Sequence, residues 1–220
     1  ESLFDELSTE IKVLFDRRDP ASIVWPRRPA MLQLLDIINA DDLGDIWDQD
    51  ETIGWVYQFF NSGEERKKMR DESQAPRNSH ELAVRNQFFT PRYVVQFLTD
   101  NTLGRMWIEM NGGESAITEQ CEYLVRPIEL PDEPRARRDP RDLRILDPAC
   151  GSGHFLLYAF DMLLAIYEEA WTGARTPPSD LTGSTLRADY PELRELRVAA
   201  PALILEHNLH GVDIDARCAQ

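Results

Sequence analysis

The feature that most constrains the fold is a short apolar run that leads into a glycine-rich turn and then a long apolar stretch. It reads ILDPACGSGHFLL, from Ile145 to Leu157. Gly151 and Gly153 flank a serine, and such glycines usually mark a sharp turn or a close approach to the main chain. Residues 143–146 suit a buried strand, whereas residues 154–171 are apolar nearly all round and predict a helix packed on more than one side.

A second strand is predicted at Leu209–Asp213, after a further helical segment. Strand, glycine turn, helix and second strand form the opening of a nucleotide-type βαβ unit. A glycine turn at the start of a helix lets a ligand approach the backbone amides closely. Asp213 ends the second strand, where a carboxylate can accept hydrogen bonds from ribose hydroxyls.

Four uses of this turn can be compared. A phosphate-binding P-loop needs a lysine and a hydroxyl residue after its second glycine, but His154 and Phe155 stand there. A dinucleotide site favours a third glycine where Leu156 stands, and Asp147 would bring negative charge to the pyrophosphate. S-adenosylmethionine carries a sulfonium and an ammonium but no phosphate, so it suits nearby carboxylates better. A turn used only for packing is the remaining alternative, although turn and terminal acid occur in the right order.

The first part of the chain is predicted to be helical. Apolar residues recur at helical spacing near the N-terminus and again in residues 31–38 and 53–60. The aromatic residues of the last segment suit the core of a helix bundle better than a platform for stacking bases. Residues 63–79 are polar and charge-dense, which predicts a loop or a solvated helix end. We therefore place a helical N-terminal domain at residues 1–78 and a second domain at residues 79–220.

The second domain has two predicted interruptions. Thr90 and Pro91 indicate a helix start, because threonine can cap free amides and proline suits the first turn. Residues 126–142 are rich in proline and charge, and we interpret them as an exposed connector with the basic core PRARRDPRD. Residues 172–191 are interpreted as a loop insertion. After the helix that follows, a separate short helix is expected to start at Pro201.

The composition limits the possible functions. With 39 acidic and 24 basic residues the formal net charge is −15, which argues against this chain gripping a DNA backbone by itself. Cys121, Cys150 and Cys218 are widely spaced and odd in number, so no disulfide framework is expected. His207 and His210 lack two further ligands, so no metal site is expected.

Targeting and membrane segments are not predicted. No apolar run is long enough to span a bilayer, and no basic region leads into an apolar stretch near residue 1. The expectation is a cytoplasmic protein without membrane partners.

Three segments, in order, resemble motifs of the adenine-N6-specific DNA methyltransferases. DPACGSGHFL is similar to their S-adenosylmethionine motif, FFTPRYVVQFL to the threonine-proline motif before it, and NLHGVDID to the ribose-binding motif after it. Together these segments cover roughly residues 88–220 with gaps. The N-terminal part, including DDLGDIWDQDETIGWVYQFFN, looks most like the large methyltransferases of BREX-type phage-defence systems. Methylation subunits of type I restriction-modification systems and methyltransferases fused to nucleases are related.

The resemblance implies an α/β fold and a role for individual residues. An N-terminal α-helical domain would precede the first part of a Rossmann-like S-adenosylmethionine-dependent methyltransferase domain, with a truncated sheet. Thr90 would hold the methionine carboxylate, and Pro91 would set the start of its helix. Asp147 would lie near the methionine ammonium, Asp213 would bind the ribose hydroxyls, and Ile214 would pack on the adenine ring. The cofactor turn would be lined by Ala149, Cys150, Gly151 and Gly153.

The catalytic motif of this family is not found in the sequence. That motif is an Asn/Asp-Pro-Pro-aromatic tetrapeptide on a later strand, which holds the adenine amino group and stacks on the flipped base. TPPSD at Thr176 lacks both the acid or amide and the aromatic ring. We therefore expect a cofactor-binding portion without catalytic residues, inactive alone. Its unpaired sheet edge should favour aggregation unless further chain or a partner covers it.

Three hypotheses on function remain. The leading one is a site-specific DNA adenine-N6 methyltransferase of a restriction-modification or phage-defence system. Its double-stranded DNA contacts would come mostly from outside this chain, and other defence-system subunits would be further partners. The alternative is a non-catalytic module that binds S-adenosylmethionine and serves as a scaffold of a defence complex. A third is methylation of protein or RNA by the same cofactor fold.

Overall fold

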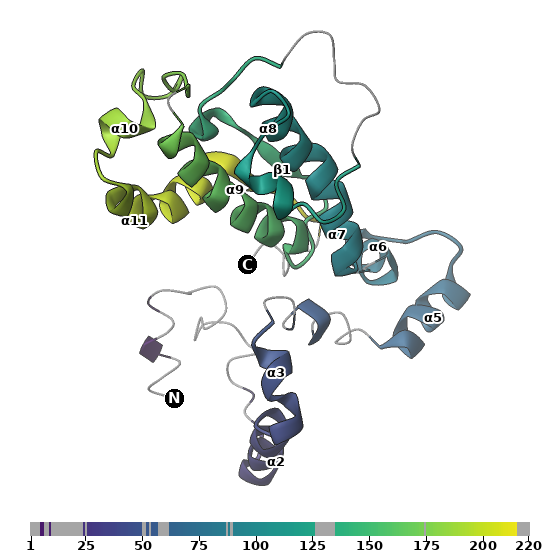
Figure 1. Cartoon of the computed structure of the whole chain (residues 1–220). Coiled ribbons are helices and arrows are strands. Elements are labelled where there is room, and N and C mark those ends of the chain that lie inside the picture. Colours follow the sequence, from purple (N-terminus) through teal and green to yellow (C-terminus); the bar gives the residue numbers. More distant parts are fainter. Residues whose placement is uncertain are drawn as a thin grey trace. The chain divides into compact units, whose positions relative to one another are not determined.

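Figure 1 shows a computed structural model of the chain. It describes residues 5, 6, 9, 24, 26–49, 52, 54–56, 62–86, 88, 90–125, 135–173 and 175–214. The chain divides into two compact units, Glu1–Ile53 with Gln220 and Gly54–Ala219. The domains expected at residues 1–78 and 79–220 stay a prediction. Across the described residues, no helix is both long enough and apolar enough to cross a membrane.

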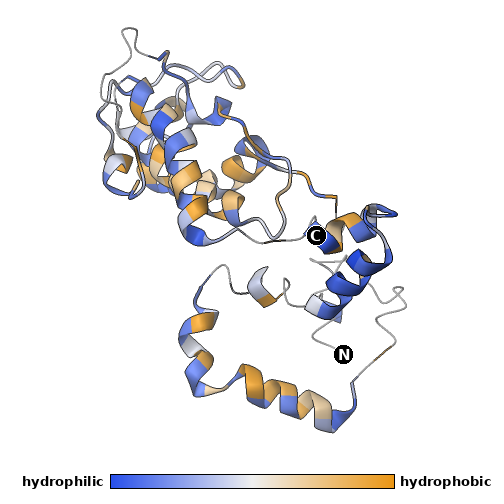
Figure 2. Cartoon of the chain, turned by 90° about the vertical axis from the view of Figure 1, so that its right-hand side faces the viewer, coloured by the Kyte–Doolittle hydropathy of each residue, from blue (hydrophilic) through white to orange (hydrophobic). Residues whose placement is uncertain are grey.

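The first unit contains a helix whose apolar side chains are largely exposed. In chain order its elements are α2 (Arg28–Ile38), the 3₁₀ helix η2 (Asp41–Leu43) and α3 (Gly44–Trp47). The helix predicted over residues 31–38 is confirmed, and Figure 2 shows the apolar residues along it. None of its residues is buried. The Trp47 indole Nε1 donates to the Ile38 carbonyl at 2.8 Å, which ties α3 to the end of α2.

The segment predicted to be a loop or a solvated helix end forms a complete exposed helix, α5 (Gly63–Glu72), followed by α6 (Ser79–Asn86). Ser62 caps α5, because its hydroxyl accepts from the Glu65 amide at 3.1 Å. The Arg70 guanidinium donates to the Arg85 carbonyl at 2.9 Å, which joins the two helices. A local cap and one cross-helix bond therefore order a segment that has no buried residue.

A long helical run follows the threonine-proline motif. It consists of α7 (Arg92–Thr99), the π-helix η3 (Asp100–Gly104) and α8 (Arg105–Met110). The predicted helix start is confirmed, but the predicted cap is wrong. Pro91 is the N-cap residue, with φ −60° and ψ 146°, and no side chain caps this end. The Pro91 carbonyl instead accepts from the Val94 amide at 2.9 Å and opens the hydrogen-bond ladder.

Both predicted strands are present and parallel, but the first was predicted to be buried and neither strand contains a buried residue. β1 (Ile145–Asp147) pairs with β2 (Leu209–Gly211) in the register Ile145↔Leu209 and Asp147↔Gly211. The ladder continues past the strand ends, because the Val212 amide donates to the Asp147 carbonyl at 2.9 Å. Within the described residues the sheet has two strands, so the structure is α/β but mostly helical.

Between the strands lies α9 (His154–Thr172), the crossover helix that the sequence predicted. Buried residues such as Leu163, Ile166 and Tyr167 form one broad face of it, and most of its other residues are half-buried. The remaining elements around it are the 3₁₀ helix η4 (Ala116–Glu119), α10 (Leu186–Asp189), α11 (Leu193–Leu203) and the π-helix η6 (Ile204–Asn208). Together with α8 they enclose the hydrophobic core of the second unit.

The prediction of a new helix at Pro201 is wrong. Pro201 lies inside α11, which runs directly into η6. A proline in a helix leaves the carbonyl four residues earlier without its usual donor. That residue is Arg197, which is exposed, so water can satisfy the carbonyl and the helix continues.

The predicted exposed connector is also wrong at its C-terminal end; residues 126–134 lie outside the described residues. The 3₁₀ helix η5 (Pro140–Asp142) is packed inside the second unit, and the Arg141 side chain is only 2% exposed. Its guanidinium donates to Asp139 at 2.8 Å, to the Ser184 carbonyl at 2.7 Å and to the Asp189 carboxylate. A buried cation thereby fixes the 172–191 insertion, which contains α10, against the segment that enters β1.

Candidate cofactor site

The glycine turn between β1 and α9 requires glycine for its backbone conformation. Gly151 has φ 53° and Gly153 has φ 83°, the left-handed region that residues with a side chain rarely adopt. A Cβ at Gly153 would meet nothing within 4 Å, so at this position conformation rather than crowding explains the glycine. The turn is closed by the Gly153 amide, which donates to the Cys150 carbonyl at 2.8 Å.

Asp213 lies next to this turn, 62 residues further along the chain. Its Oδ2 accepts a hydrogen bond from the Gly151 amide at 2.8 Å, and the side chain is partly exposed. The two features that the sequence singled out are thus brought together by the parallel strand pair. Ile214 follows and is 56% exposed beside them.

Asp147 stands at the carboxyl end of β1, before the turn. Its Oδ1 accepts from the Ala149 amide at 3.1 Å. Its Oδ2 is shielded from solvent and has no hydrogen-bond partner among the described residues. An unpaired buried carboxylate oxygen is costly, and a cationic donor would satisfy it. The residue therefore suits an ammonium ligand.

The threonine-proline motif meets the other side of the turn through His154, the first residue of α9. His154 is 5% exposed, and its Nδ1 donates to the Thr90 carbonyl at 3.2 Å. Pro91 begins the α7 run directly after this contact. The backbone of the motif, rather than the threonine side chain, makes this connection.

Cys150 lies within the turn as a free, half-buried thiol. Burial, followed by the nearby carboxylates of Asp213 and Asp147, raises the pKa of this thiol. Cys121 is buried, and burial together with Asp100 raises its pKa to about 12. Both thiols are therefore neutral at physiological pH and poor nucleophiles. No group of three or more metal-binding side chains occurs among the residues that the structure describes.

Two further positions near the turn were missed by sequence reasoning. A Cβ at Gly211 in β2 would lie 2.9 Å from Leu156 Cδ1 and 3.1 Å from Cys150 Sγ. Only glycine allows β2 to approach the turn so closely, and a glycine inside a predicted strand was the available signal. A Cβ at Gly54 would lie 2.5 Å from Ser152 Oγ, and nothing in the sequence connects these two residues.

Asn208 was also missed, and it sets where β2 begins. It is fully buried; its amide group donates to the Pro140 carbonyl at 2.7 Å and to the Leu143 carbonyl at 2.8 Å. Its Oδ1 accepts from the Tyr167 hydroxyl at 2.9 Å. One side chain thus joins the entry of β1, the crossover helix and the entry of β2. Its neighbours Glu206, His207 and His210 are also polar, so no local pattern marked Asn208 as buried.

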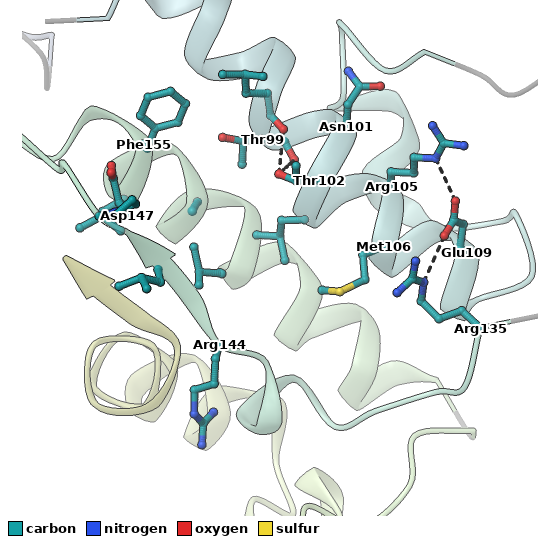
Figure 3. A pocket seen from close by; sticks show the side chains of 17 residues that line it. Thr99, Asn101, Thr102, Arg105, Met106, Glu109, Arg135, Arg144, Asp147 and Phe155 are labelled. Atoms are coloured by element: carbon teal, nitrogen blue, oxygen red, sulfur yellow. Dashed lines mark hydrogen bonds and ion pairs between the residues drawn. The ribbon is translucent and has the colours of Figure 1, made fainter. Parts of the chain in front are cut away.

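A groove of about 680 Å³ runs along β1, between the α7–α8 run and α9 (Figure 3). Leu146, Leu156 and Ala159 are among its apolar lining residues, and Leu146 is 62% exposed. At one end lies Asp147, and at the other Glu109 accepts from Arg105 at 2.9 Å and from Arg135 at 3.1 Å. The groove therefore has apolar walls, a rim on which two arginines pair with Glu109, and the Asp147 carboxylate at its other end.

Comparison with known proteins adds independent information. No protein-family model matches the chain. An adenine-specific methyltransferase BrxX of Escherichia coli O9:H4 (strain HS) is 36% identical over 215 residues, or 92% of this chain. An adenine-specific methyltransferase PglX of Lacticaseibacillus casei (strain Zhang) is 31% identical over 201 residues, or 85% of this chain. The resemblance to BREX-type adenine-specific methyltransferases is confirmed. The chain spans only 15% and 14% of the lengths of these two BREX-type relatives.

Proposed function

We propose that this chain is the cofactor-binding portion of a site-specific DNA adenine-N6 methyltransferase of a phage-defence or restriction-modification system. The protein would transfer a methyl group from S-adenosylmethionine to a flipped adenine in double-stranded DNA. The observation that carries the proposal is the bond between Asp213 and the left-handed Gly151, which assembles a glycine turn and a strand-end acid in one place. The names of the two relatives support the adenine substrate.

The residues present suit this cofactor. Asp147 offers a shielded carboxylate oxygen that has no hydrogen-bond partner in the described part of the chain, and an ammonium group would pair with it. Asp213 offers a carboxylate for ribose hydroxyls, and the exposed Ile214 offers an apolar surface for an adenine ring. Thr90 remains the proposed partner of the methionine carboxylate. The lining of the turn would be Ala149, Cys150, Gly151 and Gly153, with the Pro91 N-cap behind it.

Each component has a separate chemical task in this proposal. S-adenosylmethionine supplies a methyl group bound to a sulfonium, which is electrophilic without further activation. The carboxylate of Asp147 would hold the methionine ammonium and that of Asp213 the ribose hydroxyls, and both would favour the positive charge of the cofactor. No residue of this chain is assigned a role in activating adenine, because the family's catalytic tetrapeptide does not occur in the sequence.

The groove beside β1 fits the proposal that the catalytic strand comes from elsewhere. Parallel sheets are almost always covered on both faces and extended by further strands, whereas β1 exposes Leu146 to the groove. A further strand along β1 would cover this surface and bring its own residues close to Asp147. The acidity of the chain likewise assigns DNA contacts mainly to other regions.

The test is calorimetric titration of the full-length protein with S-adenosylmethionine, together with a methyl-transfer assay on DNA. Asp213→Ala should weaken binding by about 1.5–3 kcal/mol, because hydrogen bonds to a charged group are lost. Asp180→Ala, at an exposed acid of the 172–191 insertion, is the matched control and should bind normally.

Three outcomes separate the hypotheses. Binding that depends on Asp213, with methyl transfer to adenine N6, supports the proposal. The same binding without transfer to DNA, RNA or protein supports the non-catalytic module. A folded protein that does not bind S-adenosylmethionine would contradict both the methyltransferase and the non-catalytic module.

A further inference from the structure

The segment Gly54–Val56 lies against the glycine turn, although it is about 100 residues away in sequence. Gly54 is buried, and a Cβ added there would lie 2.5 Å from Ser152 Oγ and 2.6 Å from His154 Nε2. Real Cβ atoms do not make such contacts, so even alanine would force this segment or the side chains of Ser152 and His154 to move. The backbone at residue 54 thus touches the residues that flank Gly153.

Trp55 makes a second contact with the same turn of helix. Its ring and the His154 ring have centroids 5.9 Å apart and planes inclined by 48°, a tilted arrangement that aromatic pairs favour. Trp55 is half-buried, whereas its neighbour Val56 is 58% exposed. The aromatic side chain therefore faces the turn, and the predicted bundle-core role is not seen at this position. Residues 57–60 lie outside the described residues.

His154 joins this segment to the threonine-proline motif. Because the Nδ1 of His154 donates to the Thr90 carbonyl, the ring is held from one side by Thr90 and from the other by Trp55. Residues 54–55, 90 and 152–154 consequently meet at the first turn of α9. Ser152 is therefore contacted by Gly54, and His154 by Thr90 and Trp55, all of which lie outside the βαβ unit.

We propose that Gly54 and Trp55 are positioning residues of the cofactor site. They pack against Ser152 and His154 and hold these two residues in place. Through them they fix the left-handed backbone conformation that orients the amides of the turn. The inference rests on the proposed function, because it takes the turn to be the place where S-adenosylmethionine binds. It assigns cofactor affinity to a segment outside the three motifs.

The first experiment measures the affinity of the full-length protein for S-adenosylmethionine by calorimetry. Gly54→Ala should weaken binding by about tenfold or more, because the added methyl group displaces Ser152 and His154. Gly63→Ala is the matched control, since a Cβ there meets nothing within 4 Å, and it should leave affinity unchanged.

A second pair of variants keeps the test independent of the folding of Gly54→Ala. Trp55→Ala should weaken binding and speed cofactor dissociation in stopped-flow measurements, whereas Trp55→Phe, which keeps an aromatic ring, should restore most of the affinity. Val56→Ala, one residue further and exposed, should behave like the wild type. Thermal unfolding of each variant without cofactor reports whether the fold is intact.

Each result decides the proposal. Loss of affinity in Gly54→Ala and Trp55→Ala, with rescue by Trp55→Phe and normal controls, supports it. Normal affinity in both variants, while Asp213→Ala still weakens binding, overturns it and leaves the proposed function standing. A fall in affinity that follows melting temperature equally in the control variants shows a structural role only and also overturns it. A wild-type protein that does not bind S-adenosylmethionine overturns both proposals.

Discussion

Among single residues, Cys150 reports most directly on the charge around the turn. Its thiol lies close to Asp147 and Asp213, and burial and these two carboxylates all disfavour the thiolate. Raising a thiol pKa lowers the thiolate fraction at a given pH, and only the thiolate reacts quickly with alkylating agents. The reactivity of Cys150 therefore measures both burial and the local negative charge.

We expect Cys150 to react with iodoacetamide more slowly than free cysteine at pH 8, and its rate to keep rising at more alkaline pH. Asp213→Asn, which removes the charge but keeps an oxygen acceptor, should lower the pKa and speed the reaction. Asp180→Asn should not change it. Mass spectrometry of the Cys150 peptide gives the rates, and a wild-type rate equal to that of free cysteine would contradict the prediction.

Residues that act through local sequence were predictable, and residues that act through distant contacts were not. The order of strand, glycine turn, helix and strand-end acid was enough to expect Asp213 near the glycine turn, whereas its hydrogen bond with the Gly151 amide was not predicted. The approach of Gly54 to Ser152 has no local signature, because nothing in either segment specifies its partner. Thr90 shows an intermediate case: its motif marked the helix start, but the backbone carbonyl makes the observed contact.

At the scale of elements, the prediction of an exposed connector failed where a buried ion pair holds two loops together. PRARRDPRD has the composition of a solvated segment, yet Arg141 is buried between Asp139 and Asp189. Composition along the chain cannot reveal that the acid of α10 meets the base of η5. The helix–turn–strand order around them was predictable, because it follows from apolar periodicity and glycine placement.

Arg141→Met should destabilise the second unit by about 3–5 kcal/mol, because Asp139 would be left as an uncompensated buried charge. Arg197→Met, which breaks the exposed pair between Arg197 and Glu168, should have no measurable effect. Denaturant unfolding followed by circular dichroism compares the two variants. Equal stability of both would show that the buried pair does not anchor the insertion.

At the scale of the whole molecule, the sheet edge at β1 and the groove beside it form a large uncovered apolar surface. Leu146 is at its centre on β1, and unprotected edges of this kind promote association between chains. The sequence predicted two strands, and two are present among the described residues. The groove, however, depends on how the α7–α8 run packs on α9, which no local pattern specifies.

Leu146→Glu should reduce the aggregation of the isolated 220-residue chain and, in the full-length protein, abolish methyl transfer by keeping a further strand off β1. Val198→Glu is the control, because Val198 is 78% exposed on α11 and far along the chain from the groove. Light scattering and the transfer assay measure the two effects. Full activity of Leu146→Glu would mean that no strand is added at this edge.

The bond between Asp213 and Gly151 also has a consequence for biosynthesis. The two residues are 62 positions apart, and the Thr90–His154 contact spans 64. During translation the glycine turn therefore leaves the ribosome well before Asp213, whose carboxylate stabilises it. Thr90 likewise emerges well before His154. At typical elongation speeds of about 5–20 residues per second this interval lasts several seconds. In the proposed function, the nascent chain should consequently be unable to retain S-adenosylmethionine until residue 213 has emerged, so cofactor binding would report that the turn has met its carboxylate.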